Sequence, residues 1–436
     1  MLALAAGARA EAGQADPALS CLAGTYRAPD GEAIAIRSLS AADTFRYVYM
    51  DGRLGTLKHE SAGTFSAHPA WPASRPEPVR LSLASCDAKF ASVELSAGEA
   101  QHWVREPLRM TTIKFKSGGA ELTGQLIEPL NRSGPAPTLV FVHGSEMTPT
   151  IGANTPSLLA ASAGIASFVY DKRGTGQSKG VYTQNFETLG QDAAAAVEAV
   201  RNAAGSRIGR IGLLGMSQGG WIAPLAAAKA KADFVVVAFG VLGDPLEQDA
   251  WQVAYELRQQ GFGPELAPKI EEVTDATAKV AETDFKRNRE QLDLVRRKYG
   301  AEPWFSKISG QYSGQVLRGE FDQASSESPE VLWHYDALSV MQGIGAPQLW
   351  VLGGSDSVAP SATTVARLVD LQHAGKPIDV AVFPNADHGI YEYKTRALGF
   401  AGGVRNSVGY YRLMFDWMNG RVQGSYGDAA MFRSHP

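Results

Sequence analysis

The chain has 436 residues, of which 44% are hydrophobic, and a formal net charge of −4. This length exceeds that of one ordinary domain, so we expect two or three structural units, and the composition is typical of a globular protein. The slight negative charge and the lack of a basic cluster argue against nucleic acid or a membrane surface as a partner. No apolar run approaches the roughly 20 residues that span a bilayer.

The N-terminal residues 1–20 are expected to be either a flexible tail or the remnant of a secretory signal. Apolar Met1–Ala6 precedes a small-x-small pattern at Ala8–Ala10, which resembles the end of such a signal. Cys21 and Cys86 are the two cysteines of the sequence. Either they form a disulfide, which fits a periplasmic or secreted protein, or they are two buried thiols, which fits a cytoplasmic one.

Residues 21–108 show short stretches in which apolar and polar residues alternate with period two. This pattern predicts half-buried strands, and Asp51-Gly52 predicts a hairpin turn because both residues tolerate a positive φ. We therefore expect a small antiparallel β-rich domain, either a sandwich or a barrel. The predicted strands are Ile34–Ile36, Phe45–Tyr49, Val79–Leu83 and Phe90–Leu95.

From residue 109 onward, strand-like stretches alternate with helix-like ones, which predicts a mostly parallel sheet with helices on both faces. We assign residues 109–243 and 339–436 to this unit and expect helices at Phe186–Ala203, Trp221–Lys229 and Val404–Met418. The predicted strands are Thr111–Phe115, Leu122–Ile127, Thr138–Val142, Ala166–Tyr170, Ile211–Leu214, Phe234–Phe239, Gln348–Leu352 and Asp379–Phe383.

The alternation is interrupted at residues 244–338, which are polar and helix-forming with scattered aromatic side chains. We interpret this segment as a helical cap inserted between two strands of the sheet. The expected helices are Leu246–Gln260, Pro264–Glu282 and Phe285–Tyr299.

The hexapeptide Gly215–Gly220 contains the pattern G-x-S-x-G between a predicted strand and a predicted helix. Glycines two residues before and after the serine permit a sharp turn that exposes the hydroxyl of Ser217. A serine hydroxyl becomes a good nucleophile when a base takes its proton and a carboxylate orients that base. Downstream, Asp356 and His388 each follow a predicted strand, in the order serine, acid, histidine. We prefer Asp356 to Asp387 as the acid because neighbouring loop residues rarely point the same way.

An oxyanion hole needs hydrogen-bond donors where negative charge develops on a carbonyl oxygen. We expect one donor to be the backbone N–H of Gln218, which follows the nucleophile. The other is expected on the loop after the strand that ends at His143-Gly144, at the backbone N–H of Ser145.

These motifs resemble the α/β-hydrolase superfamily, especially bacterial serine esterases of the dienelactone-hydrolase-like and prolyl-oligopeptidase-like branches. The resemblance spans about residues 110–420 and implies the α/β-hydrolase fold, here with a helical cap insertion and a small N-terminal β-rich domain. It also implies that His143 and Gly144 shape the oxyanion loop. The residues that carry it are His143-Gly144, Asp171–Ser178, Gly215–Trp221, Asp356 and His388-Gly389.

The substrate pocket is less well specified by the sequence. Glu146 lies near the oxyanion loop and is either a pocket residue or simply exposed. Trp221 follows the serine turn, and Trp251 and Tyr255 belong to the cap, where aromatic side chains either contact substrate or form the core of the cap itself.

The sequence thus predicts a serine hydrolase that cleaves small-molecule carboxylic esters through a Ser217-His388-Asp356 triad and an acyl-enzyme. An acyl-peptidase or amidase and an acyltransferase would use the same triad and stay open as alternatives. A non-catalytic binding module is disfavoured because all triad residue types are present. No metal or organic cofactor is implied, since no ligand cluster or phosphate-binding loop is found, and assembly into a homo-oligomer is left open.

Overall fold

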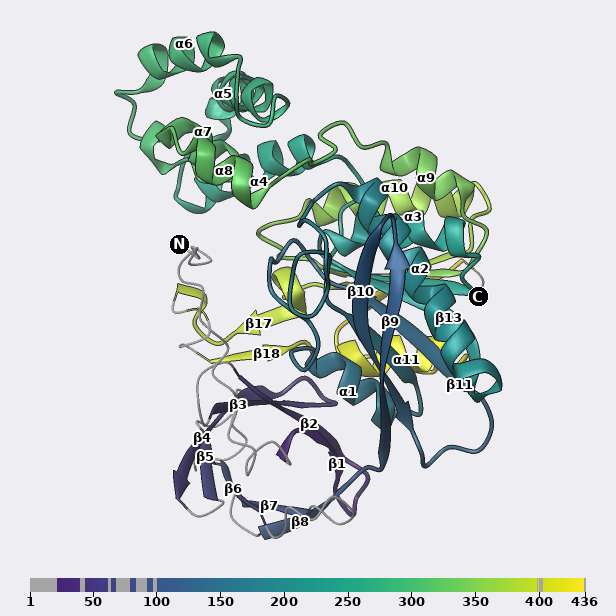
Figure 1. Cartoon of the computed structure of the whole chain (residues 1–436). Coiled ribbons are helices and arrows are strands. Elements are labelled where there is room, and N and C mark those ends of the chain that lie inside the picture. The colour runs from purple at the N-terminus through teal and green to yellow at the C-terminus, as the bar shows by residue number, and fades with distance from the viewer. Residues whose placement is uncertain are drawn as a thin grey trace.

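A computed structural model describes residues 22–39, 44–61, 64–67, 79–83, 92–96, 100–397, 399 and 403–434. Residues 1–20 and both cysteines lie outside the described residues, so the predictions made for them stay predictions. Figure 1 shows a barrel formed by the N-terminal strands, a twisted sheet covered by helices, and a helical lobe above it. Within the described residues, no helix combines the length and apolarity needed to cross a membrane.

The N-terminal unit is a closed antiparallel barrel in which each strand pairs with the next and β1 pairs with β8. The predicted hairpin at Asp51-Gly52 joins β3 to β4. Aromatic side chains such as Phe45, Phe65 and Trp103 fill the interior. The strands are β1 (Gly24–Arg27), β2 (Ala33–Ser38), β3 (Thr44–Tyr49), β4 (Leu54–Ser61), β5 (Thr64–Ala67), β6 (Val79–Leu83), β7 (Ser92–Ser96) and β8 (Ala100–Arg105).

In the part of the chain that the structure describes, the second unit contains a nine-stranded sheet of order β19-β16-β15-β14-β13-β11-β12-β10-β9. Neighbouring strands from β12 through β11 to β16 run parallel, while β9, β10 and β19 are antiparallel to their neighbours. The strands are β9 (Leu108–Ser117), β10 (Ala120–Pro129), β11 (Ala136–Val142), β12 (Ala166–Tyr170), β13 (Ile208–Met216), β14 (Phe234–Ala238), β15 (Gln348–Gly353), β16 (Ile378–Phe383) and β19 (Ala430–Phe432).

The side chains of β11 show how this sheet is buried on both faces. Val140 and Val142 pack into the cluster that contains α2 and α3, whereas Leu139 and Phe141 pack into the cluster that contains α1 and α11. Successive strand residues point to opposite faces, so a continuous apolar run needs helices on both sides. The helices of this unit are α1 (Thr155–Ser162), α2 (Phe186–Ala204), α3 (Gly219–Ala230), α10 (Ser361–His373) and α11 (Tyr410–Met418).

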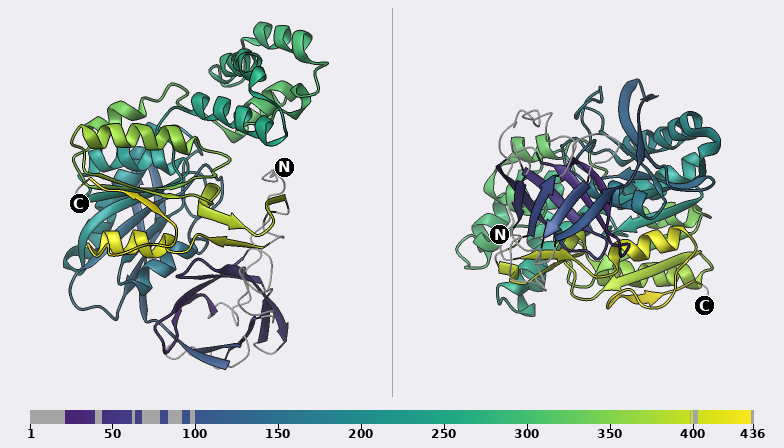
Figure 2. Two further views of the ribbon diagram at one scale, coloured as in Figure 1. Left: turned by 180° about the vertical axis from the view of Figure 1, so that it is seen from behind. Right: turned by 90° about the horizontal axis from the view of Figure 1, so that it is seen from below.

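The segment between β14 and β15 forms the helical cap. Helices α4 to α8 stand apart from the sheet as a lobe, whereas α9 packs against α3 (Figures 1 and 2). Trp333 packs edge-on against Phe285 and Tyr312, so aromatic side chains form a core of the cap itself. The helices are α4 (Pro245–Gln259), α5 (Ala267–Ala281), α6 (Arg289–Tyr299), α7 (Ser313–Arg318), α8 (Phe321–Glu327) and α9 (Ala337–Gly343). The α/β-hydrolase fold with a helical cap and an N-terminal β-rich domain is thus confirmed.

The predicted helix Val404–Met418 is wrong in its first part. Val404–Asn406 is a strand, β18, that pairs with β17 (Tyr391–Tyr393), and α11 begins only at Tyr410. Gly409 precedes the helix with a φ of 89°, a conformation that breaks a regular helix and favours glycine. Pairing with the preceding strand overrides the local helical pattern, and β17 itself was not predicted. Likewise, the helix expected at Phe285 begins at Arg289, after Asn288 in the left-handed conformation.

The packing of β10 on β12 gives a test of the fold. A Cβ added to Gly124 would lie 2.1 Å from Cζ of Phe168 on the neighbouring strand, so Gly124→Ala should lower the free energy of unfolding by about 1–3 kcal/mol through overpacking. Gly209→Ala in β13 is the matched control, because its nearest neighbour would lie at 3.6 Å. Thermal unfolding of both variants measures the difference, and equal midpoints would contradict the packing described.

Candidate active site

Ser217 occupies a tight turn between the end of β13 and the start of α3. Its φ is 53°, an uncommon value for a residue with a side chain, and its backbone N–H donates to Ala238 O at 3.1 Å. A Cβ on Gly215 would lie 2.1 Å from Gly219 O, and one on Gly219 would lie 2.2 Å from Val142 O. The two glycines of the motif are therefore required by close backbone approach, and the strained turn presents the hydroxyl at the end of the sheet.

The structure brings Ser217, His388 and Asp356 together from loops that follow three different strands. Nε2 of His388 lies 3.0 Å from Oγ of Ser217, and Nδ1 lies 3.0 Å and 3.2 Å from the carboxylate oxygens of Asp356. Asp356 is 2% exposed, and one of its oxygens also accepts from the backbone N–H groups of Val358 and Ala359. An ionised acceptor on Nδ1 places the proton there, which leaves Nε2 free to accept from the serine hydroxyl.

Asp387, the other acid next to His388, contacts the backbone of the histidine and not its ring. Its carboxylate accepts from the N–H of His388 at 2.8 Å and from the N–H and hydroxyl of Ser357 at 2.8 Å and 2.7 Å. It also forms an ion pair with Arg396 at 2.7 Å. The hydrogen bonds of Asp387 therefore link the loop that carries His388 to the loop that carries Asp356.

The groups around His388 raise the pKa of its imidazole. Burial lowers the pKa of the imidazole, but the charge of Asp356 and the hydrogen bond to it outweigh burial, so the pKa is raised above its ordinary value. Phe239 packs edge-on against the ring with centroids 5.0 Å apart. Asp356 is thus the carboxylate that raises the proton affinity of His388 most, and the charges of Asp387 and Glu146 add to its effect.

Replacing Asp356 tests this dependence. In Asp356→Asn the carboxylate charge is lost while burial remains, so the pKa of His388 should fall below the wild-type value. An NMR titration measures it, with the His388 signal assigned from its loss in His388→Asn. Asp387→Asn is the comparison, for which we expect a smaller fall. An unchanged pKa in Asp356→Asn would contradict the assignment.

The loop after β11 contains the expected oxyanion residues and lies over a buried lysine. Nζ of Lys172, which is 3% exposed, donates to the carbonyl oxygen of Gly144 and to that of Glu146 at 3.4 Å. Burial lowers the pKa of Lys172 to about 8. His143 is buried as well, and Nδ1 of its ring lies 3.5 Å from the Glu146 carboxylate. Within the described residues, no acceptor is found for the backbone N–H of Ser145 or of Gln218.

Glu146 has a side chain that is 55% exposed. Partial desolvation works to raise the pKa of its carboxyl, but the hydrogen bond with His143 and the charge of Lys172 lower it to about 2. Trp221 is buried, stacks on Phe186 and donates from Nε1 to Gly243 O at 2.7 Å, so its side chain belongs to the packed interior.

Trp251 and Tyr255 stack on each other along α4 and are both partly buried. Lys172 lies within the stretch Asp171–Ser178 that carries the family resemblance but was not predicted as a site residue, although its position directly after β12 was a usable signal. Ligand-binding residues gather where parallel strands end, and β12 lies next to β11 in the sheet.

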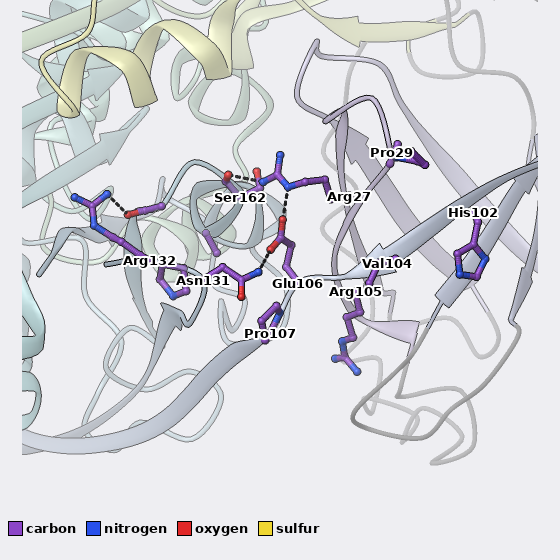
Figure 3. Close-up of a pocket in the computed structure, with 14 residues that line it drawn as sticks. Arg27, Pro29, His102, Val104, Arg105, Glu106, Pro107, Asn131, Arg132 and Ser162 are labelled. Carbon is purple, nitrogen blue, oxygen red and sulfur yellow. Dashed lines mark hydrogen bonds and ion pairs between the residues drawn. The ribbon is translucent and has the colours of Figure 1, made fainter. Parts of the chain in front are cut away.

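A pocket of about 590 Å³ lies away from these residues, at the junction between the barrel and the sheet unit (Figure 3). Arg27, Arg105 and Arg132 line it, but each donates to a protein acceptor. Arg27 bonds Glu106 and Ser162 O, Arg105 bonds Ala23 O, and Arg132 bonds Gly164 O. Within the described residues, no group of three or more His, Cys, Asp or Glu side chains is arranged to hold a metal ion.

Comparison with known proteins gives the following matches. The model of a family described as X-Pro dipeptidyl-peptidase (S15 family) matches residues 118–388. An esterase of Pyrococcus furiosus is 14% identical with a TM-score of 0.41, covering 67% of this chain and 85% of its own. An acylaminoacyl peptidase of Pyrococcus horikoshii is 16% identical with a TM-score of 0.44, covering 88% of this chain and 55% of its own. A proline iminopeptidase of Mycobacterium smegmatis is 19% identical with a TM-score of 0.43, covering 71% and 98%. No curated protein matches the chain at a significant level.

Proposed function

Since this chain belongs to the X-Pro dipeptidyl-peptidase (S15) family of hydrolases, we propose that it is a serine hydrolase that cleaves carboxylic esters with Ser217 as nucleophile. The observation that carries the proposal is the hydrogen-bonded series from Ser217 Oγ through His388 to the buried carboxylate of Asp356. A serine, a base and an orienting acid in this geometry perform acyl transfer on many unrelated folds.

In the proposed reaction, Oγ of Ser217 attacks the acyl carbon while Nε2 of His388 takes the hydroxyl proton. The carbonyl oxygen gains negative charge and accepts from the backbone N–H groups of Gln218 and Ser145. The imidazolium, stabilised by Asp356, then protonates the leaving alcohol as the bond to the acyl carbon breaks. A water molecule, deprotonated by His388, attacks the acyl-enzyme and releases the acid and Ser217.

Removal of the nucleophile tests the proposal. Ser217→Ala should lower kcat for p-nitrophenyl esters by about 10⁵–10⁶-fold, because the serine and histidine act as a unit. Labelling by a fluorophosphonate probe should also disappear, and thermal unfolding should show that the variant is folded. Ser206→Ala, at an exposed serine remote from the turn, should keep both activity and labelling. Ester hydrolysis retained by Ser217→Ala would overturn the proposal.

A second candidate is hydrolysis of amides, which the family match at residues 118–388 favours. The same triad would serve, with an amine as the leaving group. A panel of p-nitrophenyl esters of increasing acyl length, measured beside aminoacyl and Xaa-Pro p-nitroanilides, separates the two. We expect the higher kcat/KM for esters, and a consistent preference for Xaa-Pro amides would assign the chain to peptide hydrolysis instead.

A further inference from the structure

We propose that Lys172 and Tyr182 are positioning residues that orient the backbone of the oxyanion loop, so that the N–H of Ser145 faces the reacting carbonyl oxygen. The inference rests on the proposed function and goes beyond it, because neither residue belongs to the proposed triad or supplies an oxyanion donor. Two successive peptide groups of the loop are each held by one of these side chains.

The first peptide group joins Gly144 to Ser145. Its carbonyl oxygen accepts from Nζ of Lys172. In a trans peptide the C=O and N–H bonds point in opposite directions. Holding the Gly144 carbonyl toward Lys172 therefore turns the Ser145 N–H away from the lysine, and no acceptor for this N–H is found within the described residues. A flipped peptide would aim the N–H at the ammonium group and the carbonyl oxygen at the developing oxyanion.

The second peptide group joins Ser145 to Glu146. Its carbonyl oxygen accepts from the hydroxyl of Tyr182 at 2.7 Å. Burial raises the pKa of Tyr182 to about 12, so the hydroxyl keeps its proton at neutral pH. Nε2 of Gln184 donates to the same hydroxyl at 3.2 Å, which occupies a lone pair of the oxygen and directs its proton toward Ser145.

Gln184 fixes the direction of this chain of hydrogen bonds. Its side-chain oxygen accepts from Nε2 of Gln218 at 2.9 Å, and its side-chain nitrogen also donates to the carbonyl oxygen of Glu327 in the cap. Reversing the amide would place an oxygen against that carbonyl oxygen and a nitrogen against the Gln218 amide nitrogen. Gln184 is 4% exposed, and a buried amide is stable there only when its groups are paired.

Burial of Lys172 supports a role in orientation. A buried ammonium is costly unless it is paired, and here its hydrogen-bond acceptors are backbone carbonyl oxygens of the oxyanion loop. A methionine of similar length would fill the same space without this cost but could not hold the carbonyl of Gly144. The ammonium group is attracted by the Glu146 carboxylate, and its hydrogen bonds to the loop carbonyls give it the further role of holding the loop conformation.

The test compares Lys172→Met, Lys172→Arg and Tyr182→Phe with Lys179→Met, a matched change at an exposed lysine of the same loop. Outright loss of an oxyanion donor costs about 10²–10³-fold in kcat, so a misoriented donor in Lys172→Met should cost about 10–100-fold. KM for p-nitrophenyl butyrate should change little, and phenylboronic acid, whose adduct with Ser217 is tetrahedral, should bind more weakly. Lys172→Arg should restore part of kcat, and Lys179→Met should match the wild type.

Tyr182→Phe removes one hydroxyl without changing the packing, so it carries the test if Lys172→Met does not fold, and it should lower kcat with little change in KM. Unchanged kcat and boronate affinity in these folded variants would overturn the inference while an active wild type, silenced by Ser217→Ala, upholds the proposed function. A wild type that neither hydrolyses esters nor labels at Ser217 would overturn both.

Discussion

The candidate site depends on the parallel pairing of neighbouring strands. In register, Val142 pairs with Gly215, Met216 with Ala238, and Gly353 with Phe383. Parallel strands of matched register end at one edge of the sheet, so the loops that follow them meet there. Residues that are far apart in the sequence thus lie within hydrogen-bond distance of one another because the strands before them end at the same edge of the sheet.

The same constraint explains how much of the site could be predicted from the sequence. Ser217, Asp356 and His388 each follow a recognisable apolar run, so their positions after strands of the sheet could be predicted from the sequence. Tyr182 and Gln184 follow no strand directly, and their partners lie in the oxyanion loop, the serine turn and the cap. Such contacts depend on how segments far apart in the sequence pack against one another, and the local pattern of apolar residues does not predict this packing.

The fold was predictable where a strand is a continuous apolar run, and it was not predictable where a short strand forms only by pairing with another short segment. The run Thr138–Val142 is buried on both faces and was assigned correctly, whereas Val404–Asn406 has a helical pattern but pairs with β17. Trp221 shows a related difficulty. Its position next to the serine turn suggested a pocket, but α3 directs the side chain into the interior, against Phe186.

Polar contacts join the cap to the sheet unit beside the candidate site. Thr183 donates from its hydroxyl to Glu330 at 2.6 Å, and the N–H of Gln184 donates to Pro329 O at 2.9 Å. Gln184 also bonds the side chain of Gln218, so hydrogen bonds link residues 327–330 of the cap to the residue that follows Ser217. The cap and the proposed oxyanion donors therefore share hydrogen-bond partners.

The strand β18 gives the N-terminal barrel a direct connection to the loop that carries His388. The N–H of Asn406 donates to Gly52 O in the barrel at 2.9 Å, and its side chain donates to Gly389 O at 2.9 Å. A Cβ on Gly52 would lie 2.3 Å from Asn406 O, so the two backbones are in close contact. A chain shortened to begin at Leu108 would leave this N–H without its acceptor, next to the residue that follows the histidine. The barrel thus supports the loop that carries His388, and shortening the chain at the boundary of the sheet would remove that support.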